Sequence, residues 1–240
     1  MSIIFHGVSS DALHLIVEKY PARPIPKRKI ERFSVPGRSG DIVVPYNAFE
    51  NVKRVYDCYL SAEVTGQSLA ETSAAFVNWL SYGGYAELSD DYDPDVYVMA
   101  TCVAGGDIEN IQDLFGRIRI EFDCKPQRFL TAGKTMVTYS TAGTILNPTP
   151  YTARPLIKLT GTSSSGTLTV GAATLTLTET CSNVVIDCEA EDVYQLSGGV
   201  VTNLNTKVSG AVPELPAGNN AISWTGAISS VSIEPRWWLL

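Results

Sequence analysis

The sequence predicts a mainly β chain of two domains, a first β domain with one α-helix and then a β-sandwich. Short runs that alternate apolar and polar residues recur throughout, whereas a single stretch has convincing helical spacing. Residues 1–130 carry 13 Lys+Arg and 18 Asp+Glu, and residues 131–240 carry only 5 and 7. We therefore expect a first domain over 1–130, a linker over 131–152 and a second domain over 153–240.

A long charged hairpin dominates the first domain. Two β-rich runs within residues 29–44 flank Pro36-Gly37-Arg38-Ser39-Gly40, where proline presets one turn dihedral and the glycines permit positive φ. Residues 19–38 hold seven Lys or Arg against Glu31 alone. The segment is either a solvated edge whose lysines prevent aggregation or a charged docking arm. We interpret it first as an assembly element.

Further strands and the helix complete the first domain. Alternating patterns predict strands over 3–7, 13–17, 54–64, 96–103 and 115–124. Ser68-Leu69-Ala70-Glu71 has the order of a capping box and opens the helix, which ends at Gly83-Gly84. Its apolar stripe, which includes Phe76 and Leu80, predicts packing against a sheet.

An acidic loop, residues 87–95, follows the helix. Asp91, Asp93 and Asp95 alternate as in a calcium loop, but the required glycine is replaced by Val96 and the required glutamate by Cys102. The pattern therefore favours a solvated turn over a metal site.

The second domain has the pattern of a β-sandwich. Short strands are expected over 155–161, 184–188, 192–196, 221–224 and 231–240, with a hairpin over 167–178. In this hairpin the leucines should face inward and the threonines outward.

Composition excludes several classes of function. The net charge of −7 disfavours nucleic acid and anionic membranes, since phosphate binding requires a basic face. The N-terminus does not resemble a signal peptide and no stretch is long enough to span a membrane, so synthesis in the cytosol is expected. Five cysteines without a C-x-x-C pair fit neither a disulfide framework nor a zinc site, and Cys58 and Cys124 are interpreted as small buried hydrophobes.

No catalytic constellation is found in the sequence. There is no G-x-S-x-G motif, the phosphate-loop spacing at 161–166 has Thr167 in place of lysine, and His6 and His14 have no partner at ligand spacing. We expect no enzyme, no catalytic residue, no metal and no cofactor.

Tryptophans near the C-terminus offer one candidate binding feature. Trp224 and Trp238 are candidates for stacking against a sugar. Trp237 and Trp238 are adjacent on a strand, so at most one of them can belong to the core. The alternative is that the other contacts protein or a neighbouring loop.

Several short segments, taken in order, cover nearly the whole chain. They include Phe5-His6-Gly7, Val35-Pro36-Gly37-Arg38-Ser39-Gly40, Phe76-Val77-Asn78-Trp79-Leu80, Leu88-Ser89-Asp90-Asp91-Tyr92-Asp93-Pro94-Asp95, Phe122-Asp123-Cys124-Lys125-Pro126, Ile186-Asp187-Cys188-Glu189, Leu215-Pro216-Ala217-Gly218-Asn219-Asn220 and Ile233-Glu234-Pro235-Arg236-Trp237. Together, in this order and spacing, they resemble the distal tail protein (Dit) family of long-tailed bacteriophages and prophages.

The resemblance implies a structural baseplate hub in the virion tail tip. The first domain would be a split-barrel-like, tail-tube-like domain that forms a hexameric ring. The second would be a galectin-like or carbohydrate-module-like sandwich. The implied partners are further copies of the chain, the tail tube protein, the tail-associated tip protein and a receptor-binding protein, with assembly in the host cytoplasm.

Two charged surfaces are candidate ring contacts. We hypothesise that a basic arm meets an acidic loop across the subunit interface and sets its register. The alternative function is a carbohydrate-binding adhesin that recognises host cell-wall glycan. The residues of the two surfaces are, for the arm, Lys27, Arg28, Lys29, Arg32 and Arg38 and, for the loop, Glu87, Asp90, Asp91, Asp93 and Asp95.

Overall fold

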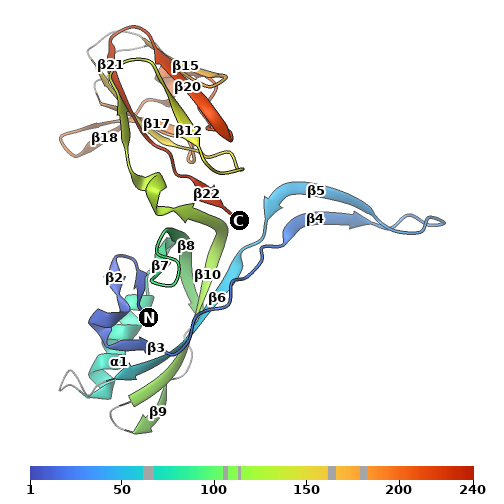
Figure 1. The fold of residues 1–240 in the computed structure, drawn as a ribbon, viewed down its shortest axis with the longest axis vertical. Coiled ribbons are helices and arrows are strands. Elements are labelled where there is room, and N and C mark those ends of the chain that lie inside the picture. The colour runs from blue at the N-terminus through green and yellow to red at the C-terminus, as the bar shows by residue number, and fades with distance from the viewer. Residues whose placement is uncertain (62–67, 105–107, 113–114, 162–165, 179–182) are drawn as a thin grey trace. The chain divides into compact units, whose positions relative to one another are not determined.

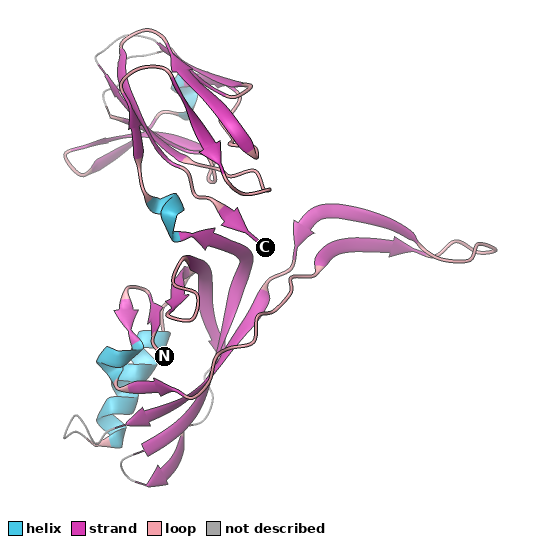
Figure 2. Ribbon diagram, in the orientation of Figure 1, coloured by secondary structure: helices cyan, strands magenta, loops and turns pink. Residues whose placement is uncertain are grey.

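The computed structural model describes residues 1–61, 68–104, 108–112, 115–161, 166–178 and 183–240. The chain divides into two compact units, residues 1–128 with Leu240 and residues 129–239. Strands dominate both units, and α1 is the one α-helix in the described part of the chain (Figures 1 and 2). The predicted mainly β fold is confirmed. No helix among the described residues is long and apolar enough to cross a membrane.

The first unit is built on one curled antiparallel sheet in the order β2-β1-β7-β8-β10-β6-β3, with β9 paired to β10. A two-stranded hairpin, β4–β5, extends from this sheet (Figure 1). The elements are β1 (Ile3–Phe5), β2 (Val8–Ser9), β3 (Leu15–Val17), β4 (Arg28–Phe33), β5 (Ile42–Phe49), β6 (Val52–Ser61), α1 (Leu69–Leu80), β7 (Ala86–Asp90), β8 (Val96–Ala104), β9 (Glu109–Gln112) and β10 (Phe115–Leu130).

The helix begins as its capping box predicts. The Ser68 hydroxyl accepts from the Glu71 N–H at 3.3 Å, and the Glu71 carboxylate accepts from the Ser68 N–H at 3.0 Å. Phe76 and Trp79 face the core, and the Trp79 indole N–H donates to the Phe5 carbonyl at 3.1 Å. The helix is therefore fixed to β1 by packing and by one buried hydrogen bond.

A buried polar network lies between β6 and β7. The Tyr56 hydroxyl donates to Asp90 Oδ2 at 2.7 Å, and Arg54 Nη1 lies 3.6 Å from the same oxygen. Asp90 Oδ1 accepts from the Asp93 N–H at 3.1 Å. Burial and the nearby Asp90 charge raise the pKa of Tyr56, so this hydroxyl remains a donor.

The second unit is a sandwich of two antiparallel sheets, β11-β21-β13-β16-β17-β18 and β12-β20-β14-β15-β19. Its strands are β11 (Val137–Tyr139), β12 (Gly143–Asn147), β13 (Leu156–Gly161), β14 (Gly166–Val170), β15 (Ala173–Leu177), β16 (Val184–Asp187), β17 (Asp192–Ser197), β18 (Val200–Asn203), β19 (Val208–Gly210), β20 (Gly218–Trp224) and β21 (Ile228–Glu234). The short strand β22 (Trp238–Leu239) follows and belongs to neither of these two sheets.

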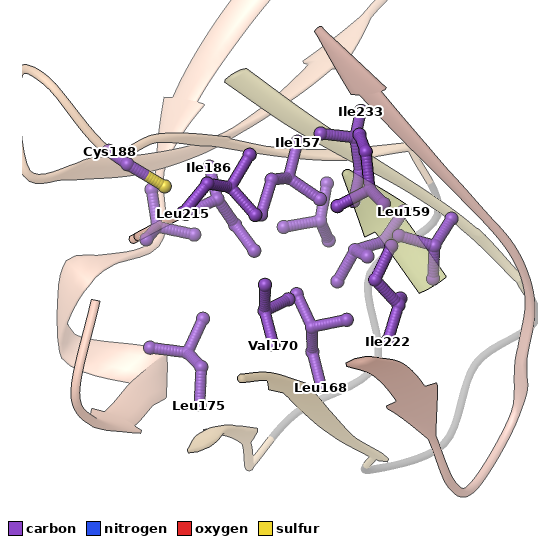
Figure 3. Close-up of a cluster of buried hydrophobic side chains, with 14 of the residues drawn as sticks. Ile157, Leu159, Leu168, Val170, Leu175, Ile186, Cys188, Leu215, Ile222 and Ile233 are labelled. Carbon is purple, nitrogen blue, oxygen red and sulfur yellow. The ribbon is translucent and has the colours of Figure 1, made fainter. Parts of the chain in front are cut away.

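Side chains from both sheets fill the sandwich (Figure 3). In the β14–β15 hairpin Leu168 and Leu175 are buried, whereas the paired Thr169 and Thr174 lie outside and join their hydroxyls at 3.1 Å. The predicted orientation of this hairpin is confirmed. Trp237 is buried in the core, and Trp238 is partly buried and packs against the same core.

The segment expected to be a linker, residues 131–152, differs from that expectation. It carries β11 and β12, which pair with β21 and β20. Val137 and Tyr139 alternate with polar residues, and Ile145 is buried in the sandwich core. The Gly and Pro residues around these short strands suggested a linker, but they mark turns between strands at the sheet edges.

Removal of the Tyr56 hydroxyl should destabilise the first unit. Tyr56→Phe deprives the buried Asp90 carboxylate of a hydrogen bond, which costs about 1–3 kcal/mol in free energy of unfolding. Urea denaturation followed by fluorescence and circular dichroism measures this loss. Tyr59→Phe, on the other face of β6, is the matched control and should cost less than about 0.5 kcal/mol. Equal losses in the two variants would contradict the role given to the network.

Candidate assembly interface

The arm, defined as residues 18–51 with β4 and β5 at its centre, is a two-stranded antiparallel ribbon. Within the described part of the chain, β4 and β5 pair only with each other. At the tip the Arg38 N–H donates to the Val35 carbonyl at 3.1 Å, and Gly37 has φ of 81°. The predicted turn at Pro36-Gly37 is confirmed, because proline at its second position and glycine at its third meet the demands of a type II turn.

Apolar side chains are exposed on both faces of this ribbon. Residues directly opposite in the ladder share a face. Phe33 with Ile42 and Val44 therefore line one face, and Val43 lies opposite Arg32 on the other. Every residue of β4, and every residue of β5 except its last, is exposed. The large apolar side chains are 37% to 59% exposed, and they are Ile30, Phe33, Val35, Ile42, Val43, Val44 and Tyr46.

The arm is also basic. Residues 18–51 hold seven Lys or Arg and four Asp or Glu, a net charge of +3, which leaves −10 on the remainder of a chain whose total is −7. The arm residues predicted as a contact surface are all exposed: Lys27, Arg28, Lys29, Arg32 and Arg38. Arg28 also stacks its guanidinium 5.1 Å from the centre of the Phe49 ring, which fixes it at the start of the ribbon.

A cavity of about 360 Å³ lies at the base of the arm. The proline-rich segment 21–26 forms one wall, and Phe49, Val52, Val98 and Pro126 contribute apolar side chains to the others. The base of the arm therefore bridges a hollow and does not pack closely on the sheet.

The acidic loop, residues 87–95, does not form one exposed surface. Glu87, Asp91 and Asp95 are exposed. Asp90 is buried in the network with Tyr56, and the structure thus corrects its assignment to a surface patch. Asp93 is half-buried. Its carboxylate forms an ion pair with Arg128 and lies 3.7 Å from Arg23, so it has partners within the chain.

The candidate stacking tryptophans both have partners within the second unit. Trp238 stacks on Tyr151 with ring centroids 4.4 Å apart, and its indole N–H donates to the Thr152 carbonyl at 3.0 Å. The Trp224 indole N–H donates to the Ile228 carbonyl at 2.9 Å. Each indole is thus fixed by the fold, and glycan stacking stays a prediction.

Among the described residues, no group of three His, Cys, Asp or Glu is placed to hold a metal ion. Cys58 and Cys124 are fully buried, which confirms their interpretation as small hydrophobes. Burial raises the pKa of the Cys58 thiol to about 12, so it stays protonated near neutral pH.

The sequence reasoning missed the apolar surface of the arm. The prediction of a contact surface rested on the charged residues of the arm, whereas the apolar run Ile42-Val43-Val44 is the stronger indication of one. Three consecutive apolar residues in a hairpin strand place apolar side chains on both faces, and a ribbon with no sheet behind it must expose both.

Comparisons with known proteins identify solved structures that have a similar fold. The sequence matches no protein-family model and no curated protein. Among solved structures, the chain is similar to the SPP1 Dit protein, described as a paradigm of the hub adsorption apparatus in phages that infect Gram-positive bacteria. The TM-score is 0.73 at 12% identity, over 100% of this chain and 99% of that one.

Two structures of the phage P2 baseplate in its activated conformation, with calcium and with strontium, are also similar. Their TM-scores are 0.54 and 0.53 at 10% identity, over 92% of this chain and 90% of the matched chains. Both units of this chain fall within the aligned length of the SPP1 protein. The chain therefore has the Dit-like fold that its sequence motifs predicted.

Proposed function

We propose that this protein is a structural hub of a phage tail tip, and that the arm carries the contact between copies in a ring. The observation that carries the proposal is the exposure of apolar side chains on both faces of β4–β5. An isolated two-stranded ribbon is at best marginally stable in water, and exposed apolar patches of this kind mark interaction surfaces.

Charge supports a second copy as the partner. The arm has a net charge of +3 and the remainder of the chain −10, so an arm laid on a neighbouring copy meets a surface of opposite charge. An arm that binds elsewhere on its neighbour makes a head-to-tail contact, and such contacts close into rings when the rotation permits. Exposed Asp91 and Asp95 remain candidates for the receiving surface.

The similarity to known phage proteins supports the finer details of the proposal. The structural neighbours belong to a phage hub and a phage baseplate. We propose a ring of six copies that joins the tail tube protein to the tail-associated tip protein and to a receptor-binding protein. The protein would be assembled in the host cytoplasm and carried in the virion, with a structural role and no catalysis.

Reversal of the basic arm charges should weaken assembly. Lys27→Glu, Arg28→Glu and Lys29→Glu together place like charges at the proposed contact, and we expect association to weaken roughly 100-fold at low salt. Sedimentation velocity over a concentration series measures the change. Lys134→Glu, Lys158→Glu and Lys207→Glu alter the net charge equally in the second unit. An equal loss in this control would show that net charge, and not the arm, governs assembly.

The apolar face of the arm should contribute at any salt concentration. Phe33→Ser with Val44→Thr removes apolar surface from one face without changing charge, and we expect roughly tenfold weaker association at both low and high salt. Ile4→Thr with Ile16→Thr, which changes exposed apolar residues of β1 and β3, is the control. Unchanged assembly in the arm variant, with circular dichroism showing a folded chain, would contradict the proposal.

A further inference from the structure

The two connections between the arm and the body are held in different ways. On the outgoing side β5 ends at Phe49 and β6 begins at Val52, so the chain runs almost directly into the sheet. Between them the Asn51 side chain donates to the Tyr85 hydroxyl and to Asp123, both at 2.7 Å. On the incoming side residues 18–27 separate β3 from β4, and part of this segment bridges the cavity.

Side-chain contacts attach the incoming segment to the turn between β7 and β8. The Tyr20 and Tyr92 rings stack with centroids 4.4 Å apart, and the Arg23 guanidinium lies 4.7 Å from the centre of the Tyr92 ring. Arg23 Nη2 also lies 3.7 Å from Asp93 Oδ2. Tyr92 thus contacts both arm residues, and Asp93 adds an ion pair to one of them.

The turn that makes these contacts is itself fixed to the body. The Asp93 N–H donates to the buried Asp90 carboxylate at 3.1 Å, and the Asp93 carboxylate pairs with Arg128 on β10. The arm residues that this turn contacts are largely exposed to water, since Tyr20 is 64% exposed and the Arg23 side chain is 58% exposed. The turn between β7 and β8 is therefore held in place, whereas the base of the arm is exposed to solvent. The contacts between the turn and the arm base are weak and reversible.

We infer that Tyr92 and Asp93 form a latch that holds Tyr20 and Arg23 and so fixes the direction in which the arm leaves the body. With the latch closed, the arm is held in one direction before it meets a partner. With the latch open, the proline-rich base retains its extended conformation, but Tyr20 and Arg23 lose these side-chain contacts, and the segment stays attached to the body through Glu18 and Lys19. Tyr92 and Asp93 are thus positioning residues for the arm.

The latch gives a physical reason for the aromatic residue in an acidic turn. A solvated turn needs no ring at position 92, whereas this ring is covered on one side by Tyr20 and is approached by Arg23. An arm already held in its binding direction loses less conformational freedom on association, which favours assembly. This consequence for assembly rests on the proposed function, but the latch itself does not.

The direction of the arm is measured within one chain. Spin labels are introduced as non-natural amino acids at Ser39, at the arm tip, and at Asn78, on an exposed face of α1, so that the native cysteines remain. Electron–electron resonance on the monomeric fraction, diluted with unlabelled chain, gives the distance distribution. We expect one narrow distribution for the unaltered sequence. In Tyr92→Ala and in Arg23→Gln the population at other distances should rise about tenfold.

Two controls separate the latch from a general loss of structure. Tyr92→Phe keeps the ring and should restore the narrow distribution. Asp95→Asn changes an exposed charge on the same turn outside the latch contacts and should have no effect. Arg23→Gln alters an exposed side chain and should leave the fold intact. This variant therefore tests the latch even where Tyr92→Ala fails to fold. Distributions in Tyr92→Ala and Arg23→Gln that match the unaltered chain would overturn the latch.

Assembly of the same variants gives the second readout. Tyr92→Ala should assemble less than the unaltered chain at equal concentration, and Tyr92→Phe should assemble normally. Broadened distances with normal assembly would support the latch and overturn its consequence for assembly. If the unaltered chain fails to assemble at all, the proposed function fails, whereas the distances still decide whether the latch exists.

Discussion

The main physical constraint on the first unit is that a two-stranded ribbon cannot bury the apolar side chains on its own two faces. Within the part of the chain that the structure describes, β4 and β5 pair only with each other, and apolar side chains on both faces are exposed. A sheet of three or more strands, or a strand packed on a helix, solves this problem within one chain. Here β6 joins such a sheet, whereas within the described residues β4 and β5 pair only with each other, and the proposed partner that covers the ribbon is a second copy of the chain.

The body of the first unit presents an ordered turn to the base of this ribbon. Tyr56 and Arg54 fix Asp90 in the interior, and Asp90 in turn holds the backbone of the turn that carries Tyr92. The buried charge is expensive unless it is paired, so this network specifies one conformation of the turn. The core thereby orders the surface turn, and in the proposed latch this turn is the fixed partner of the more exposed arm base.

Much of this architecture could be predicted from local patterns. The Pro36-Gly37 turn, the capping box at Ser68 and the inward-facing Leu168 each follow from a few neighbouring residues. The burial of Asp90 could not be predicted. An aspartate that ends a strand beside other acidic residues has the same local sequence pattern whether its side chain faces water or a buried tyrosine. The contact of Tyr92 with the arm base depends on long-range packing, which local patterns do not encode. The linker prediction was wrong for the related reason that edge strands and linkers share Gly, Pro and Thr.

The measurement that tests the central claim most directly is the solution mass of the unaltered chain, by light scattering at low and high salt, beside a variant in which residues 28–49 are replaced by a short Gly-Ser turn. The account predicts a mass near six times the 25.9 kDa of one chain for the unaltered protein, and a folded monomer for the variant without the ribbon. A variant that assembles as the unaltered chain does would show that the arm is not the contact between copies and would contradict the account.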